Sequence, residues 1–286
     1  MNLTDYMQRQ KAWIERSLNE WLPDLQTPPT RLHDAMRYSV MAGGKRLRPI
    51  LALATGELVD ADPEKLIKPA LALEIFHTYT LIHDDLPCMD DDDLRRGLPT
   101  AHKKFDEATA VLAGDALLTL SFEWLAEHSG QLVTELAMAG GHAGVIAGQV
   151  ADLAAEKNPP DAQMLDYIHL NKTAALLRCS IRIGAIAGKA PQETLNALSS
   201  FGTDIGLAFQ IIDDILDSTA DTDTLGKPAG SDQEQGKTTY VDVYGIDGAR
   251  ERATAMYQRA MATLREVDGD TTTLEHLAQF ICDRDH

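Results

Sequence analysis

Apolar residues recur at spacings of three and four along almost the whole of this 286-residue chain. That spacing places them on one face of an α-helix, whereas the alternating patterns rich in Val, Ile and Thr that mark strands are rare. We therefore predict an all-α fold. Clusters of Gly, Pro and Asp separate predicted helices at 3–22, 29–42, 48–59, 64–84, 108–128, 131–156, 161–170, 174–188, 192–218, 248–267 and 273–283.

The connections between these helices are short, with one exception. No fixed-period repeat or linker composition divides the chain, so we predict a single domain over residues 1–286. The exception runs from 219 to 240 and is rich in Gly, Asp, Ser and Thr. Loops of this length inside a domain are uncommon and often functional. We expect 219–240 to be a lid-like loop.

The charge balance excludes some classes of partner. The chain has 26 Lys and Arg against 44 Asp and Glu, a formal net charge of −18. Such a chain is a poor ligand for nucleic acid or an anionic membrane. The uncharged run at 136–151 is too short to span a bilayer, and the N-terminus lacks the apolar core of a signal peptide. Three scattered cysteines indicate a reducing compartment, so we expect a cytoplasmic protein without membrane insertion.

A first acidic cluster follows the apolar segment 72–82. Residues 83–93 read HDDLPCMDDDD, and six of the ten residues from Asp84 to Asp93 are aspartates. Such carboxylates repel one another unless a cation lies among them. Carboxylate oxygens are ligands for Mg²⁺, which is commonly held by one or two carboxylates together with substrate phosphates. The alternative interpretation is a solvated acidic turn.

A second cluster lies inside an apolar helix. Asp213, Asp214 and Asp217 occur in FQIIDDILD (209–217), and the i,i+4 spacing of Asp213 and Asp217 places them on one face. Buried like charges cost several kcal/mol, so this helix needs a metal or basic partners. The alternative is an ordinary helix end. Two such clusters suggest carboxylate walls that face each other across a cavity.

Basic residues form small groups that complement the two clusters. Guanidinium and ammonium groups bind phosphate oxygens directly, and metals neutralise the remaining charge, so a diphosphate bridged by Mg²⁺ suits this combination. Each group taken singly could instead serve solubility or stabilise a helix end. The groups are Lys45, Arg46 and Arg48 in GGKRLRP, Arg95 with Arg96, Lys172, and the loop residues Lys227 and Lys237.

These motifs make the chain resemble the short-chain trans-prenyl diphosphate synthases, and most of all the bacterial farnesyl diphosphate synthases. The resemblance covers nearly the whole chain. It implies an antiparallel helical bundle around a central cavity, the isoprenoid synthase fold, which is usually homodimeric and works with three Mg²⁺ ions. The matching segments are GGKRLRP (43–49), EIFHTYTLIHDDLPCMDDDDLRRGLPT (74–100), AGDALLTL (113–120), GQVADL (148–153), NKTAALL (171–177), FQIIDDILD (209–217) and GKPAGSDQEQGKTTY (226–240).

The resemblance also implies a role for each matching residue. Asp84 and Asp90 would coordinate two Mg²⁺ ions and Asp213 the third, supported by Asp85, Asp214 and Asp217. The allylic substrate, dimethylallyl or geranyl diphosphate, would bind through Arg95, Lys172, Thr173, Gln210, Lys227 and Lys237. Isopentenyl diphosphate would bind beside it on Lys45, Arg48, His77 and Arg96. For His77, a satisfied core histidine is the competing interpretation.

The chemistry of such a site follows from its charges. Breaking a C–O bond to a diphosphate requires stabilisation of the leaving charge and leaves an allylic cation, which must be kept from water. A helix break at Lys172 and Thr173 and the Gln210 amide could place carbonyl dipoles near that cation, and the released diphosphate could take the final proton. The expected reaction is the Mg²⁺-dependent head-to-tail condensation of isopentenyl diphosphate with dimethylallyl and geranyl diphosphate to (2E,6E)-farnesyl diphosphate.

Product length depends on what closes the cavity below the first cluster. Thr80 lies one helical turn before Asp84 and Tyr79 one residue further, so the Tyr79 ring is expected to form a floor, with Phe76 as a second stop. The resemblance associates an aromatic residue there with a C15 product. Cys88 inside DDLPCMD resembles some geranylgeranyl synthases, so a C20 product stays open, as does a non-catalytic regulatory subunit.

Two unrelated or divergent classes fit the motifs less well. A di-iron bundle needs paired Glu-x-x-His motifs, and only Glu74 to His77 approximates one. A terpene cyclase would lack the basic site for a second diphosphate, which Lys45, Arg48 and Arg96 supply here.

Overall fold

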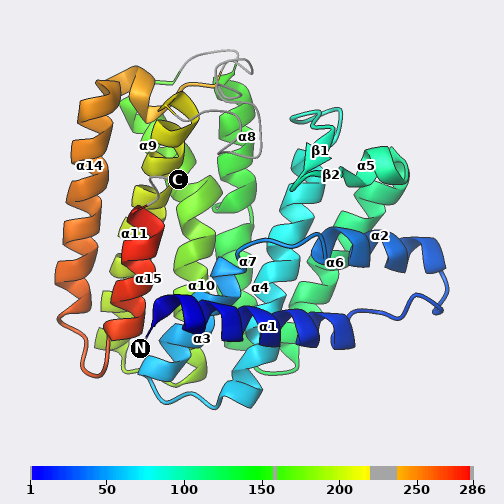
Figure 1. Cartoon of the computed structure of the whole chain (residues 1–286), viewed down its shortest axis with the longest axis horizontal. Helices are drawn as coiled ribbons and strands as arrows, with labels where there is room; N and C mark the ends of the chain where they lie inside the picture. Colours follow the sequence, from blue (N-terminus) through cyan, green and yellow to red (C-terminus); the bar gives the residue numbers. More distant parts are fainter. Residues whose placement is uncertain (1, 157–159, 220–236, 284–286) are drawn as a thin grey trace.

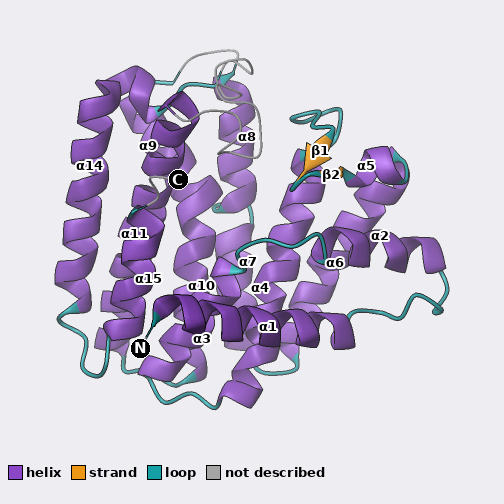
Figure 2. Cartoon of the chain, viewed as in Figure 1, coloured by secondary structure: helices purple, strands orange, loops and turns teal. Residues whose placement is uncertain are grey.

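The computed structural model describes residues 2–156, 160–219 and 237–283. The prediction of an all-α fold is confirmed: helix runs through most of the described chain, and a short hairpin of β1 (Leu94–Arg95) and β2 (Leu98–Pro99) supplies the strands found there (Figure 2). The helices are α1 (Leu3–Trp21), α2 (Thr30–Val40), α3 (Leu47–Leu58), α4 (Pro63–Asp84), α5 (Ala101–Lys104), α6 (Glu107–Ala126), α7 (Gly130–Gly140), α8 (Val145–Ala155), α9 (Ala162–His169), α10 (Ala175–Ala187), α11 (Gln192–Thr219), α14 (Tyr240–Leu264) and α15 (Thr272–Cys282).

The helices pack into a bundle with α4 at its centre. α4 contacts α6, α3 and α10, while α10 contacts α11, and α11 contacts α14 (Figure 1). Helix α1 crosses the direction of these helices (Figure 1). Nearly every side chain of α3 and of the middle of α4 is buried, as expected for helices that are apolar around their whole circumference. This core holds the C-terminal end of α4, and with it the first aspartate motif, in a fixed position.

Three local features differ from the sequence expectation. The predicted helix 131–156 is interrupted by a turn between α7 and α8. In this turn Gly144 approaches the backbone so closely that a Cβ atom on it would lie 1.9 Å from the Ala139 carbonyl oxygen. The hairpin was not predicted; its turn residues Arg96 and Gly97 both have positive φ, as a two-residue hairpin turn requires. Helix α14 begins at Tyr240 rather than 248 and contains a kink at Gly245.

Helix α6 has the length and hydropathy of a membrane-spanning helix, the one such helix within the described ranges. In the bundle it packs against α4, α2 and α7. One face of α6 is therefore buried in the bundle, while Val111 and Leu112 are exposed. Of the predicted lid-like loop at 219–240, residues 220–236 lie outside the described residues.

Candidate active site

A cavity of about 660 Å³ lies between α4, α6, α8, the start of α10 and α11. Its lining includes charged and polar side chains, among them Asp84 and the nearby Lys172, together with apolar and aromatic ones. The residues predicted for the site that line it are Arg48, His77, Tyr79, Thr80, Asp84, Lys172, Thr173 and Gln210. Side chains predicted to act on both substrates therefore meet at one cavity.

The two aspartate motifs lie at the same end of the bundle. The Lys237 ammonium lies 3.4 Å from Asp90 of the first motif, and the Tyr240 backbone N–H donates to Asp214 of the second at 2.8 Å. Residues three apart in sequence span at most about 10 Å. Residues 237–240, which lead into α14, thus bridge the two motifs and place them near each other; of the predicted aspartates, only Asp84 lines the cavity.

Asp84 ends α4 and lines the cavity. Burial raises the pKa of its carboxyl to about 6, although the nearby Lys172 ammonium lowers it. A divalent cation would favour the ionised carboxylate. Among the described residues no three His, Cys, Asp or Glu side chains gather into a complete metal site. The donors fit the usual magnesium arrangement, in which one or two carboxylates share the ion with substrate phosphates.

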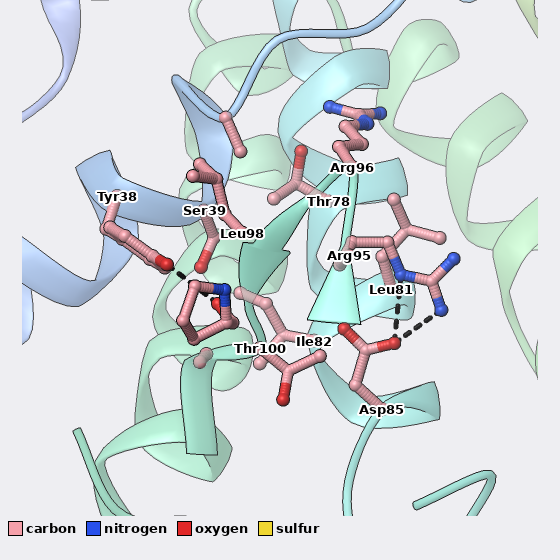
Figure 3. Close-up of a pocket in the computed structure, with 13 residues that line it drawn as sticks. Tyr38, Ser39, Thr78, Leu81, Ile82, Asp85, Arg95, Arg96, Leu98 and Thr100 are labelled. Carbon is pink, nitrogen blue, oxygen red and sulfur yellow. Dashed lines mark hydrogen bonds and ion pairs between the residues drawn. The ribbon is translucent and has the colours of Figure 1, made fainter. Parts of the chain in front are cut away.

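Asp85, the neighbour of Asp84, holds Arg95 in place. The Arg95 Nε donates to Asp85 at 2.9 Å, and a second guanidinium nitrogen also donates to Asp85 (Figure 3). The same nitrogen donates to Asp92 at 3.2 Å. Asp85 is buried. Asp85 therefore forms a hydrogen-bonded ion pair that places the Arg95 guanidinium at the first motif, while its predicted support of Mg²⁺ stays a prediction.

Arg96 points in a different direction from Arg95 (Figure 3). Its guanidinium donates to the carbonyl oxygen of Gly43. A Cβ atom on Gly44 would lie 2.7 Å from the centre of the same guanidinium, so the Arg96 side chain would have to move, and the φ of +120° at Gly44 itself favours glycine. The hairpin is thereby connected to the loop that carries Lys45 and leads into α3, where Arg48 lies.

Asp214 is the hydrogen-bond centre of the second motif. It is buried and accepts from the Gln210 side chain at 2.9 Å and from the Tyr240 backbone, while the His169 Nε2 lies 3.6 Å away. These partners suit the supporting role predicted for Asp214. Asp213, one residue earlier, is half-buried, and Asp217 is buried one turn further along α11.

The helix break predicted at Lys172 and Thr173 is a π-helical turn, Leu170–Ala174, that joins α9 to α10 without interruption. π-helical turns are rare and are frequent at functional sites. Lys172 forms an ion pair with Asp152 of α8 at 2.5 Å, and Thr173 donates to the Gln210 side-chain oxygen at 2.8 Å. The turn therefore fixes both side chains at the cavity.

Gly148 allows α8 to approach this π-helical turn. A Cβ atom on Gly148 would lie 2.2 Å from the backbone nitrogen of Lys172. Because that contact is with backbone, it could be relieved only by moving one helix away from the other. Gly148 and Asp152 lie one helical turn apart in α8, so the same stretch of α8 both supports the turn and pairs with its lysine.

The residues predicted to bind isopentenyl diphosphate lie around the start of α3. Arg48 and His77 line the cavity, and the Lys45 ammonium lies 5.8 Å from the centre of the Phe280 ring on α15. Burial, together with the charges of Arg48 and Arg96, lowers the pKa of His77 well below its ordinary value. The imidazole is therefore neutral at pH 7 and can act as a hydrogen-bond donor but not as a cation.

Tyr79 and Phe76 lie in series below the first motif. Tyr79 and Thr80 line the cavity, whereas Phe76 packs edge-on behind Tyr79 with ring centres 4.7 Å apart. A Cβ atom on Gly140 would lie 2.1 Å from the Phe76 ring, so that ring is packed against the backbone of α7. The geometry suits Tyr79 as the floor and Phe76 as its support.

Sequence reasoning assigned no role to several residues at the site. Asp152 was visible inside GQVADL, and Glu74 inside EIFHTYT, but their partners Lys172 and Arg46 lie 20 and 28 residues away. No short-range pattern signals such pairs. Lys227, predicted to bind the allylic diphosphate, lies outside the described residues.

Comparison with known proteins identifies similar chains over the full length. A family model described as polyprenyl synthetase matches residues 29–274. Farnesyl diphosphate synthase of Escherichia coli (strain K12) is 43% identical over 296 residues, covering 98% of this chain and 99% of the relative. Chloroplastic geranylgeranyl pyrophosphate synthase 11 of Arabidopsis thaliana is 46% identical over 292 residues, covering 98% and 81%.

A solved structure of a related enzyme has the same fold. The crystal structure of a geranyltransferase from Helicobacter pylori, complexed with magnesium and isoprenyl diphosphate, has a TM-score of 0.83 and 32% identity, covering 98% of this chain and 96% of that one. C15 and C20 synthases are thus matched at similar identity. Identity alone does not fix the length of the product.

Proposed function

Because this chain belongs to the polyprenyl synthetase family, we propose that it is a farnesyl diphosphate synthase. It is a short-chain prenyltransferase; the proposed reaction is the Mg²⁺-dependent head-to-tail condensation of isopentenyl diphosphate with dimethylallyl and then geranyl diphosphate to (2E,6E)-farnesyl diphosphate. The observation that carries the proposal is a single cavity lined by Asp84, Lys172 and the buried Tyr79 ring.

The charged residues at the cavity are suited to ionising the allylic diphosphate. Asp84 and Asp90 would hold two Mg²⁺ ions and Asp213 a third, and the ions would neutralise charge on the leaving diphosphate. Lys172 and Lys237, which already lie among the motif's carboxylates, would bind the phosphate oxygens, together with Arg95 and Lys227. Ionisation of the C–O bond would leave an allylic cation in the cavity.

The rest of the cavity would direct that cation to one partner. Carbonyl groups of the π-helical turn and the Gln210 amide, held by Thr173, would stabilise it electrostatically. Lys45, Arg48, His77 and Arg96 would bind isopentenyl diphosphate so that its alkene attacks the cation. A carbon–carbon bond forms, and the released diphosphate accepts the proton that is lost. Apolar walls would exclude the water that would otherwise trap the cation.

A product assay tests this function. Purified protein with Mg²⁺ and labelled isopentenyl diphosphate is given dimethylallyl, geranyl or farnesyl diphosphate in separate reactions, and chain length is read by chromatography. We expect C15 from the two shorter starters and no extension of farnesyl diphosphate. Extension to C20 would support the alternative, a geranylgeranyl diphosphate synthase with the same mechanism. Absence of condensation with every starter would favour a non-catalytic regulatory subunit.

His77 is predicted to bind its substrate as a neutral donor. Since burial and two neighbouring arginines lower its pKa well below the ordinary value, protonation contributes nothing at neutral pH. We expect His77→Gln, which keeps a neutral donor, to change KM for isopentenyl diphosphate by less than about threefold. His77→Ala should raise it about tenfold, the cost of one lost hydrogen bond. Equal KM values for the two variants would support the core-histidine interpretation.

We also propose that the active form is a homodimer. Exposed apolar side chains occur on the successive helices α6, α7 and α8, and two of them also lie in the open wall of the cavity. An uncovered wall would admit water, and exposed apolar patches commonly mark interfaces between identical subunits. A second copy of this chain would cover both the exposed apolar side chains and the open wall of the cavity. The side chains are Val111, Leu112, Met138, Ile146 and Val150.

Light scattering after size exclusion tests the dimer. The wild type should have twice the 31.3 kDa mass of the chain. Leu112→Glu with Met138→Glu should give monomers, because each buries a charge at the proposed interface. Leu25→Glu, at an exposed leucine between α1 and α2, is the matched control and should stay dimeric. A monomeric wild type would contradict the proposal.

Location in the cytoplasm also stays a proposal. Its support is the three cysteines: Cys88 is exposed, Cys179 is buried, and all three are free thiols. Free thiols suit a reducing compartment.

A further inference from the structure

Arg46 is a buried charge for which the proposed reaction provides no use. It lies between Lys45 and Arg48 in the loop that joins α2 to α3, and its side chain is fully buried. Its φ of +53° is in the left-handed region that favours glycine. Arginine is almost never fully buried unless it is paired, so both its burial and its backbone conformation require an explanation.

The partners of Arg46 connect this loop to three helices. Its Nη1 donates to Glu74 of α4 at 2.7 Å, and Nη2 donates to the carbonyl oxygen of Val40 at the end of α2, also at 2.7 Å. Glu15 of α1 lies 3.7 Å from Nε. The Glu74 side chain is only 2% exposed. The loop is therefore fixed from inside the bundle by a single guanidinium group.

The anchor and the substrate-binding side chains share the same short segments. Lys45 precedes Arg46 directly, and Arg48 follows it by two residues. On α4, His77 lies one turn after Glu74, and three-residue spacing puts the two on neighbouring positions of one face. A shift of this loop and of the start of α3 relative to α4 would therefore change the distance from Lys45 and Arg48 to His77.

We propose that the Arg46–Glu74 ion pair is a positioning device, which sets Lys45 of the loop and Arg48 at the start of α3 against His77 on α4 for binding of isopentenyl diphosphate. This inference rests on the proposed function, because it concerns one of its two substrates. Stability alone does not account for the pair: replacing a buried ion pair by apolar residues is often neutral or stabilising. The pair instead holds one conformation of a loop in which Gly43, Gly44 and Arg46 all have positive φ.

The test compares three variants. Glu74→Gln keeps the shape of the side chain but removes its charge, and Arg46→Met with Glu74→Leu removes both charges together. The control is Glu135→Gln, which breaks the bidentate ion pair of Glu135 with Arg182 at 2.6 and 2.9 Å between α7 and α10. Each is measured for KM of isopentenyl diphosphate, KM of geranyl diphosphate, kcat and melting temperature.

We expect Glu74→Gln to raise KM for isopentenyl diphosphate about tenfold while KM for geranyl diphosphate changes less than twofold. Glu74→Gln should also lower the melting temperature, because it leaves the Arg46 charge buried without its partner. The double variant should have a melting temperature near that of the wild type but keep the raised KM for isopentenyl diphosphate. Glu135→Gln should lower the melting temperature without changing either KM.

Two results would overturn the positioning role: a double variant with native KM for isopentenyl diphosphate, or equal increases of both KM values in Glu74→Gln. If Arg46→Met with Glu74→Leu does not fold, the comparison of the two KM values in Glu74→Gln decides: a selective increase for isopentenyl diphosphate supports the positioning role, and equal increases overturn it. Failure of the proposed function is distinguishable, because then the wild type itself does not condense the two substrates.

Discussion

Replacing Asp84 with alanine is expected to lower kcat by about 1,000-fold or more, equivalent to several kcal/mol of transition-state stabilisation. Asp84 is the aspartate of the first motif that lines the cavity, and it lies close to Lys172. Its loss would remove a carboxylate ligand of Mg²⁺ and leave the diphosphate without part of its neutralising charge. Steady-state turnover of geranyl with isopentenyl diphosphate measures the effect, and Asp213→Ala should behave alike.

The same substitution should not destabilise the metal-free protein. Because burial raises the pKa of Asp84 to about 6, the ionised carboxylate at neutral pH opposes folding, so its removal raises the free energy of unfolding above that pH. We expect the melting temperature without Mg²⁺ to stay the same or rise. An inactive Asp84→Ala protein that is also unfolded would leave the metal role unsupported, and retained turnover would refute it.

An isosteric pair of variants separates the role of Asp84 from the charge of the cluster. Asp84→Asn and Asp91→Asn each remove one negative charge from the same acidic run, but Asp91 is exposed. Asn also tolerates the positive φ at Asp91. Turnover should fall in Asp84→Asn and stay near wild type in Asp91→Asn. Equal losses would indicate a general effect of charge rather than a ligand.

The raised pKa also predicts how the Mg²⁺ requirement depends on pH. Below a pH of about 6 the Asp84 carboxyl is protonated in the metal-free protein, and the proton competes with the ion. The Mg²⁺ concentration for half-maximal rate should therefore rise as the pH falls through this value. A requirement that does not change with pH would argue that Asp84 is not a ligand.

The sequence predicted the helical fold and the two aspartate motifs because both are local. Helix periodicity extends over many residues, and a cluster such as 84–93 is visible without knowing any contact. The hairpin was missed because its strands have only two residues each, too short for an alternating pattern. The break in the predicted helix 131–156 depends on a close backbone approach at Gly144. The several glycines in this segment are compatible with a break, but they do not indicate at which residue it occurs.

The contacts that organise the site could not be predicted, since they join distant parts of the chain. Glu74 meets Arg46 across 28 residues, and Tyr240 meets Asp214 across 26. A helix break was predicted at Lys172 and Thr173, but not that it is a continuous π-helical turn over Leu170–Ala174. On α4, which is buried around most of its circumference, the apolar pattern does not indicate which side faces the cavity. The spacing of Tyr79 and Phe76 from Asp84 was the signal that placed them below the first motif.

Replacing Tyr79 with alanine should lengthen the principal product from C15 to C20. The Tyr79 ring lines the cavity five residues before Asp84, so its removal would extend the space along which the growing chain lies. Phe76 would then form the new limit, because it packs behind Tyr79 and against α7. Reaction of farnesyl diphosphate with labelled isopentenyl diphosphate, inert in the wild type, measures the change.

Two neighbouring variants identify the ring as the cause. Tyr79→Phe keeps the ring and should keep a C15 product, whereas Phe76→Ala removes the support behind it and should give a mixture of C15 and C20. Loss of a buried aromatic ring costs up to about 3–5 kcal/mol of stability, so products are compared at equal amounts of folded protein. An unchanged C15 product from Tyr79→Ala would contradict the floor. C20 from both Tyr79→Phe and Tyr79→Ala would instead attribute the limit to the hydroxyl group, since only that group is absent from both.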